Sequence, residues 1–191
     1  MLREKEEIVE PMHFIYLTPV VAIIALIFAY MRAAWVQKQD PGNERMQIIG
    51  KWVADGAMAF LKQEYRVLAI FVVAVAVLLG VSNQMVGAAQ NTNGIIAVSF
   101  ILGALCSALA GFFGMKTATA ANIRTASAAR KGLNDALQVA FKGGSVMGLS
   151  VAGLALLGLG TLLVVYTSMI DGALDGGDST MLVLNLLSGF S

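Results

Sequence analysis

The stretch GIIAVSFILGALCSALAGFFGM, residues 94–115, contains no charged side chain. A transmembrane helix needs about 20 predominantly apolar residues, because about 30 Å of hydrocarbon is crossed at about 1.5 Å per residue. This stretch therefore predicts a membrane-spanning helix. Three further stretches of similar length and composition predict three more spans, at residues 12–31, 67–86 and 144–169.

The composition of the whole chain favours lipid as its main solvent. Of its 191 residues, 58% are hydrophobic and 13% are charged, whereas soluble domains are about half apolar and about a quarter charged. A fifth apolar stretch at residues 181–191 covers about 16 Å, roughly half of the hydrocarbon core. We predict an all-α, polytopic transmembrane helix bundle with four complete spans and the start of a fifth. Residues 1–191 are expected to form the N-terminal part of a single multi-span membrane domain of a longer protein.

The Lys and Arg residues are distributed unevenly among the connections between spans. Six lie in the loop at about 32–66 and five in the loop at about 116–143, whereas the loops at about 87–93 and 170–180 contain none. Positively charged residues accumulate on the cytoplasmic side of membrane proteins. The two basic loops are therefore predicted to be cytoplasmic and the N-terminus to lie outside, in a multi-pass protein of a bacterial-type inner (cytoplasmic) membrane.

Both basic loops are expected to be largely helical. Over residues 46–64, apolar side chains recur at three- and four-residue steps, which predicts an amphipathic helix leading into the second span. Pro41-Gly42-Asn43 predicts a turn just before that helix. Residues 116–131 also predict a helix, with Gly132 ending it and Asn134 capping the next one.

Two ladders of small residues at every fourth position predict faces on which helices pack together. In lipid there is no hydrophobic drive between helices, so small side chains favour association by permitting close backbone approach. The ladders are Gly103, Ser107 and Gly111 in the third span, and Gly144, Gly148 and Ala152 in the fourth.

The residues by themselves identify no catalytic, cofactor-binding or metal-binding side chain. The candidate ionisable residues of the spans are His13 and Lys142, and both lie at span edges. Asp55 and Glu64 are nine residues apart, so they point to opposite faces of one helix and cannot share a metal ion. No Walker A motif, nucleophile elbow or zinc-ligand cluster occurs. Nucleic acid is not an expected partner, because no basic stripe with interleaved aromatic residues is present.

Three stretches resemble the membrane-bound, ion-pumping inorganic pyrophosphatases. They are GAMAFLKQEY at 56–65, GMKTATAANIRTA at 114–126 and AFKGGSVMGL at 140–149. The last residues, LSGFS at 187–191, resemble the opening of that family's fifth helix. The similarity extends over nearly the whole chain from the first span onward.

This resemblance implies a homodimeric protein of about sixteen helices with its N-terminus outside. Such proteins hydrolyse cytoplasmic pyrophosphate with Mg²⁺ and move H⁺ or Na⁺ outward across the membrane, with K⁺ or Na⁺ as candidate activators. The family's aspartate-rich motifs and ion-gate residues lie beyond Ser191. No position here therefore receives a catalytic, cofactor-binding or metal-binding role by matching, and the segment alone is expected to be inactive.

The sequence is also compatible with two other functions. One is a non-catalytic membrane scaffold or accessory subunit. The other is part of an unrelated secondary transporter, whose sites would lie at broken helices near the bilayer midplane. The residues that choose between H⁺ and Na⁺, or that set K⁺ dependence, are not in this stretch.

Overall fold

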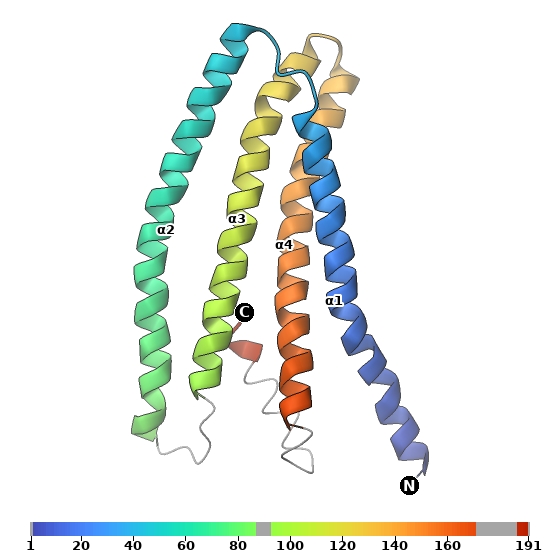
Figure 1. Ribbon diagram of the computed structural model, residues 1–191, viewed down its shortest axis with the longest axis vertical. Helices are drawn as coiled ribbons and strands as arrows, with labels where there is room; N and C mark the ends of the chain where they lie inside the picture. The colour runs from blue at the N-terminus through green and yellow to red at the C-terminus, as the bar shows by residue number, and fades with distance from the viewer. Residues whose placement is uncertain (1, 87–92, 171–186, 191) are drawn as a thin grey trace. The chain divides into compact units, whose positions relative to one another are not determined.

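Four long α-helices make up most of the computed structural model, which describes residues 2–86, 93–170 and 187–190. In chain order, coloured from blue to orange in Figure 1, they are α1 (Leu2–Gln37), α2 (Glu44–Val86), α3 (Asn93–Ala129) and α4 (Leu133–Ile170). The described residues contain no strand. All four helices are long and apolar enough to cross a membrane. The all-α class and the four complete spans are therefore confirmed.

The helices are longer than the spans that they contain. α2 begins at Glu44 and continues without a break to Val86, so the predicted amphipathic helix over residues 46–64 does lead directly into the second span. α3 likewise continues past Met115 to Ala129. The predicted start of a fifth span at 181–191 falls mostly outside the described residues.

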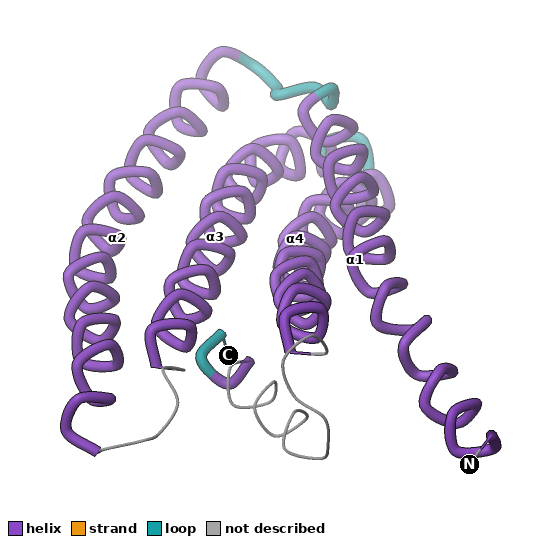
Figure 2. The backbone as a smooth tube through the Cα atoms, turned by 60° about the horizontal axis from the view of Figure 1, so that its bottom comes forward, coloured by secondary structure: helices purple, strands orange, loops and turns teal. Residues whose placement is uncertain are grey.

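The chain divides into two compact units, and each of the four helices contributes a segment to both. The first unit comprises residues 1–23, 69–106 and 154–191, and the second comprises 24–68 and 107–153. The connections α1–α2 and α3–α4, drawn in teal in Figure 2, both belong to the second unit.

The core of the first unit lies between α3 and α4. Leu162 and Tyr166 of α4 are buried there, and four partly buried side chains pack against them: Ile96, Leu163, Leu187 and Phe190. The Tyr166 hydroxyl shares a hydrogen bond of 2.5 Å with Oγ of the fully buried Ser99. Polar atoms within hydrocarbon need protein partners, so this pair ties the two helices together.

Glycines permit the closest approaches in the first unit. A Cβ on Gly160 of α4 would lie 3.0 Å from Cγ2 of Thr18 and 3.2 Å from Cδ of Pro19, both in α1. Cβ atoms on Gly103 and Gly158 would overlap Phe190. Gly103 is therefore a close-packed position, as predicted, whereas Ser107 of the same predicted ladder is exposed.

The connection before α2 forms the predicted turn. Gly42 has a φ of 84°, in the left-handed region that favours glycine. Its N–H donates to Oδ1 of Asp40 at 2.9 Å. The N–H of Met46 donates to Oδ1 of Asn43, also at 2.9 Å. Asn43 thus caps the N-terminus of α2 by satisfying one of its free backbone donors.

Close contacts also join α2 to α3 in the second unit. A Cβ on Gly50 would lie 2.7 Å from Cδ1 of Ile123. The Tyr65 hydroxyl donates a short hydrogen bond to the carbonyl of Ala108 and lies beside Gly111. Gly111, from the predicted ladder, is therefore also a packing position.

The second predicted ladder makes no contact with another helix in the described part of the chain. No described atom lies within 4 Å of a Cβ built on Gly144 or Gly148, and Ala152 is exposed. The neighbouring Gly143 makes the contact instead, because a Cβ there would lie 2.5 Å from Cβ of Ala121 in α3. Because α4 is apolar on every side, the spacing of its small residues does not show which face contacts a neighbouring helix.

The predicted cap at Asn134 is wrong. α4 begins at Leu133, so Asn134 lies inside the first helical turn. The carbonyl of Gly132 already accepts a hydrogen bond from the N–H of Ala136 at 3.2 Å. Gly132 does separate the two helices, since it belongs to neither α3 nor α4.

Candidate functional site

Acidic side chains do not converge anywhere in the described part of the chain. Asp55 and Glu64 are both exposed on α2. Within the described ranges, no group of three or more His, Cys, Asp or Glu side chains is placed to hold a metal ion. The side chain of His13 lies outside the described residues.

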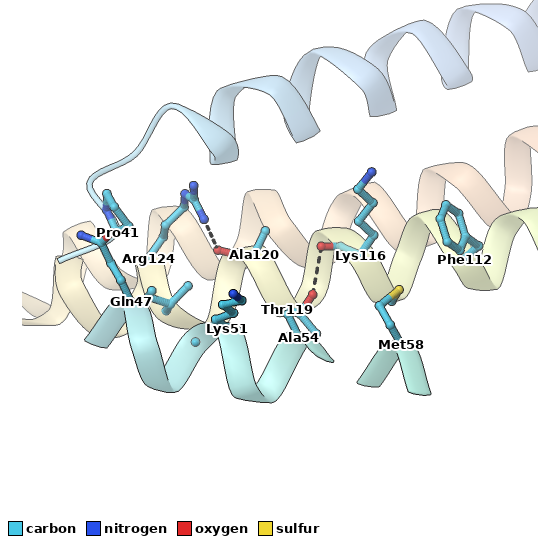
Figure 3. A pocket seen from close by; sticks show the side chains of 12 residues that line it. Pro41, Gln47, Lys51, Ala54, Met58, Phe112, Lys116, Thr119, Ala120 and Arg124 are labelled. Atoms are coloured by element: carbon cyan, nitrogen blue, oxygen red, sulfur yellow. Dashed lines mark hydrogen bonds between the residues drawn. The ribbon is translucent and has the colours of Figure 1, made fainter. Parts of the chain in front are cut away.

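A cavity of about 580 Å³ lies between the N-terminal half of α2 and the C-terminal half of α3, within the second unit (Figure 3). We call it the basic cavity, because three of its lining residues are cations and none is a carboxylate. The cations are Lys51, Lys116 and Arg124. The remaining lining residues are Pro41, Gln47, Gly50, Ala54, Met58, Phe112, Thr119, Ala120 and Ile123.

The lining follows directly from helical periodicity. On α2 the residues Gln47, Lys51, Ala54 and Met58 are spaced by four, three and four positions, which places them on one face. On α3 the same rule groups the residues from Phe112 to Arg124. Met58 and Phe112 therefore lie at the end of the basic cavity that is nearer the spans, and Gln47 and Arg124 lie at the other end.

Gly50 and Ile123 form one wall of the basic cavity. A second cavity of about 350 Å³ also borders these two residues, and it is lined mainly by apolar side chains of α2 and α3. The close contact at Gly50 holds the two helices together beside both cavities.

Arg124 is fixed by two hydrogen bonds. Its Nη1 donates to the carbonyl of Ala120 at 2.9 Å, drawn as a dashed line in Figure 3, and its Nη2 donates to the carbonyl of Gln37 at 3.1 Å. Gln37 is the last residue of α1, where a cation is favoured by the helix dipole. The Nε atom is buried and has no hydrogen-bond partner among the described residues.

Two lysines lie against aromatic rings in the second unit. The ammonium of Lys116 is 5.9 Å from the centre of the Phe112 ring, at the apolar end of the basic cavity. The ammonium of Lys142 is 3.4 Å from the centre of the Trp35 ring. Such cation–π contacts contribute about 0.5–2 kcal/mol, depending on how far they are removed from water. The Lys142 contact joins α4 to α1.

The basic cavity was not predicted from the sequence. In the sequence, Lys51, Lys116 and Arg124 indicated only that their loops are cytoplasmic. Their grouping depends on which faces of α2 and α3 meet, and 65 positions separate Lys51 from Lys116 along the chain. The helix predicted over residues 46–64 contains the α2 residues that line the cavity, but its apolar stripe lies on another face, and the partner helix was not predicted.

The sequence profile of the family described as "Inorganic H+ pyrophosphatase" matches residues 23–191. The chain belongs to this family. All three stretches that carry the resemblance fall inside the matched range, in α2, α3 and α4 respectively. The stretch 114–126 also supplies Lys116 and Arg124 to the basic cavity.

Curated relatives are similar over most of this chain. The K(+)-insensitive pyrophosphate-energized proton pump of Caldanaerobacter subterraneus is 40% identical over 171 residues, which are 85% of this chain and 23% of the relative. The protein of the same name from Pyrobaculum aerophilum is 42% identical over 152 residues, or 79% and 21%. The K(+)-stimulated pyrophosphate-energized sodium pump of Thermotoga maritima is 44% identical over 141 residues, or 73% and 18%. The chain spans about a fifth of the length of these relatives.

Proposed function

We propose that this chain is the N-terminal part of a pyrophosphate-energised ion pump. The complete protein would hydrolyse cytoplasmic pyrophosphate to phosphate and move H⁺ or Na⁺ outward across the membrane. The observation that carries this proposal is the family match over residues 23–191. It is supported by relatives named as proton and sodium pumps, and it argues against an unrelated secondary transporter.

The segment itself would supply outer helices rather than the reaction centre. In pumps, ionisable residues inside the membrane mark the ion path, because each is costly to hold in hydrocarbon. The predicted spans 67–86, 94–115 and 144–169 contain no Asp, Glu, Lys, Arg or His. We therefore assign no catalytic, cofactor-binding or metal-binding residue to this chain, and we expect residues 1–191 alone to be inactive.

Mg²⁺ is the metal expected for the complete protein, with K⁺ or Na⁺ as candidate activators. Mg²⁺ prefers several oxygen ligands, usually carboxylates and the substrate's phosphates. The exposed, separated Asp55 and Glu64 do not fit such a site, so we derive no catalytic step at these helices. The Mg²⁺ ligands would come from the rest of the protein.

The proposed orientation places the loops at about 32–66 and 116–143 in the cytoplasm and the N-terminus outside. It is supported by the six and five basic residues of those loops. The complete protein would be a homodimer in a bacterial-type inner membrane, with residues 1–191 in a single multi-span domain.

Hydrolysis by the purified complete protein tests the proposed function. We expect Mg²⁺-dependent release of phosphate from pyrophosphate, and none from residues 1–191 expressed alone and inserted in membranes. Absence of pyrophosphate hydrolysis in a folded, lipid-reconstituted complete protein would refute the proposal and leave a scaffold or accessory role.

Cysteine labelling tests the proposed orientation. In the variant Lys131→Cys, whose position is exposed, the cysteine should react with an impermeant maleimide in inside-out vesicles and not in right-side-out ones.

A further inference from the structure

The part of α2 that precedes its predicted span carries an apolar face that is largely exposed. The large side chains of this face are 48–68% exposed: Ile49, Trp52, Val53, Phe60 and Val67. Gly56 lies among them, and a Cβ built there would meet no described atom within 4 Å. We call these six residues the outer face of α2.

The outer face of α2 is a charge-free stripe. Five of its residues are spaced by four, three, four and seven positions, which places them on one side of the helix: Ile49, Val53, Gly56, Phe60 and Val67. Trp52 borders this stripe. Between Ile49 and Phe60 the charged residues are Lys51 and Asp55, and both lie on the opposite side of α2. Apolar residues at such heptad spacing are typical of helices that pack lengthwise against another helix.

The membrane does not cover the outer face of α2. Trp52 and Phe60 precede Val67, the first residue of the predicted span, by 15 and seven residues. These separations correspond to about 22 and about 10 Å along the helix, whereas the polar layer of a bilayer is about 5–8 Å thick on each side. Both side chains therefore lie in water beyond the headgroups. A contiguous apolar patch exposed to water marks a surface that binds another protein segment.

An apolar cavity adjoins the outer face of α2 within the second unit. It has a volume of about 350 Å³, and Ile49 and Val53 belong both to its lining and to the outer face. The other lining residues carry no charge: Met46, Gly50, Thr119, Asn122, Ile123 and Ala126. An apolar side chain that enters this cavity is removed from water, which favours its binding.

We propose that a second long helix of the same polypeptide, from outside residues 1–191, covers the outer face of α2 and places an apolar side chain in this cavity. The inference rests on the proposed function, in which residues 1–191 are one part of a longer pump. Because the chain spans about a fifth of the length of its relatives, about four-fifths of the complete protein lies outside it.

The position of the outer face indicates which kind of helix covers it. The face continues to Val67, where the predicted span begins, so its partner runs along α2 from water into the membrane. A membrane helix of the same polypeptide is held near α2 by its connections. A separate protein would lose translational freedom on binding.

Photo-crosslinking in the complete protein tests this occupant. Benzoylphenylalanine replaces Trp52 in one variant and Asp55 in a control variant, because Asp55 is exposed on the opposite side of α2. Native membranes are irradiated, and the adducts are identified by mass spectrometry. We expect the probe at position 52 to join a peptide of the same polypeptide from outside residues 1–191. The probe at position 55 should not join that peptide.

Gly56→Leu in the complete protein tests the same contact by stability. Leucine favours a helix more than glycine does, and position 56 faces open space among the described residues. If a helix covers this position, the larger side chain overpacks the contact, and the melting temperature falls below that of wild type. Lys62→Leu is the control, because Lys62 is exposed on the opposite side of α2. This control should melt close to the wild-type temperature.

Four results would overturn the proposal. A covalent dimer formed at position 52 would assign the outer face to a second copy, and an adduct with a different protein would assign it to a separate partner. Absence of any adduct at position 52, or a Gly56→Leu protein that melts at or above the wild-type temperature, would leave the face in water. Pyrophosphate hydrolysis is measured on the same variants. Hydrolysis without the expected adduct refutes only the docking, and the adduct without hydrolysis refutes only the proposed function.

Discussion

Gly143 and Gly144 are adjacent in α4, yet the structure predicts opposite responses to the same substitution. A Cβ at position 143 would lie 2.5 Å from Cβ of the buried Ala121. A Cβ at position 144 would meet no described atom within 4 Å. Gly143→Ala therefore forces α4 away from α3 in the second unit, whereas Gly144→Ala adds a methyl group to an exposed surface.

The magnitude follows from the geometry. Carbon atoms in favourable contact are about 3.5–4.0 Å apart, so the two methyl groups at 143 and 121 must separate by about 1 Å or more. Overpacking of this kind typically costs about 1–3 kcal/mol. Replacing glycine by alanine within a helix contributes up to about 1 kcal/mol of stabilisation at either position. Because that term is common to both variants, their difference measures the overpacking alone.

The assay is thermal unfolding of the complete protein in detergent, followed by loss of the monodisperse peak in size-exclusion chromatography. Gly144→Ala should melt at or slightly above the wild-type temperature, and Gly143→Ala clearly below Gly144→Ala. A double variant with Ala121→Gly should lose less stability than the two single substitutions added together, because it removes the opposing methyl group. Equal melting of the two single variants, or a more stable Gly143→Ala, would refute the packing described here.

Two further substitutions test other contacts by the same assay. Tyr166→Phe removes the buried hydrogen bond to Ser99 and should destabilise the protein by about 0.6 kcal/mol, at most about 1.7 kcal/mol. Tyr30→Phe is the control, because Tyr30 is 75% exposed, and it should have no effect. An equal loss of stability in both variants would show that the hydrogen bond to Ser99 does not account for the effect at Tyr166. Asn43→Ala removes the cap of α2 and should lower the free energy of unfolding by about 0.5–2 kcal/mol. Asn134→Ala should lower it little. A larger loss for Asn134→Ala than for Asn43→Ala would instead support the helix cap predicted at Asn134.

The sequence predicts the helices well because the bilayer imposes their length. Each of the spans 12–31, 67–86, 94–115 and 144–169 falls inside one helix. The turn at Pro41-Gly42-Asn43 was also predictable, since only local chemistry decides it: a glycine at positive φ followed by a side-chain cap.

Contacts between helices were harder to predict. The ladder at Gly144 and Gly148 is as regular as that of Gly103 and Gly111, but only the latter two positions lie against another part of the chain in the described structure. Small-residue spacing marks faces that are able to pack, and the choice among them depends on the neighbouring helix. The basic cavity was not predictable for the same reason, because Lys51 and Arg124 come from different helices.

Pyrophosphate-driven ion uptake by sealed inside-out vesicles tests the central claim most directly. The vesicles would contain the complete protein encoded by the gene for these residues, with Mg²⁺ and pyrophosphate added outside. We predict uptake of H⁺ or Na⁺ that stops when pyrophosphate is omitted and collapses with the matching ionophore. Hydrolysis without any uptake, or no response to pyrophosphate in vesicles shown to hold the folded protein, would contradict the account.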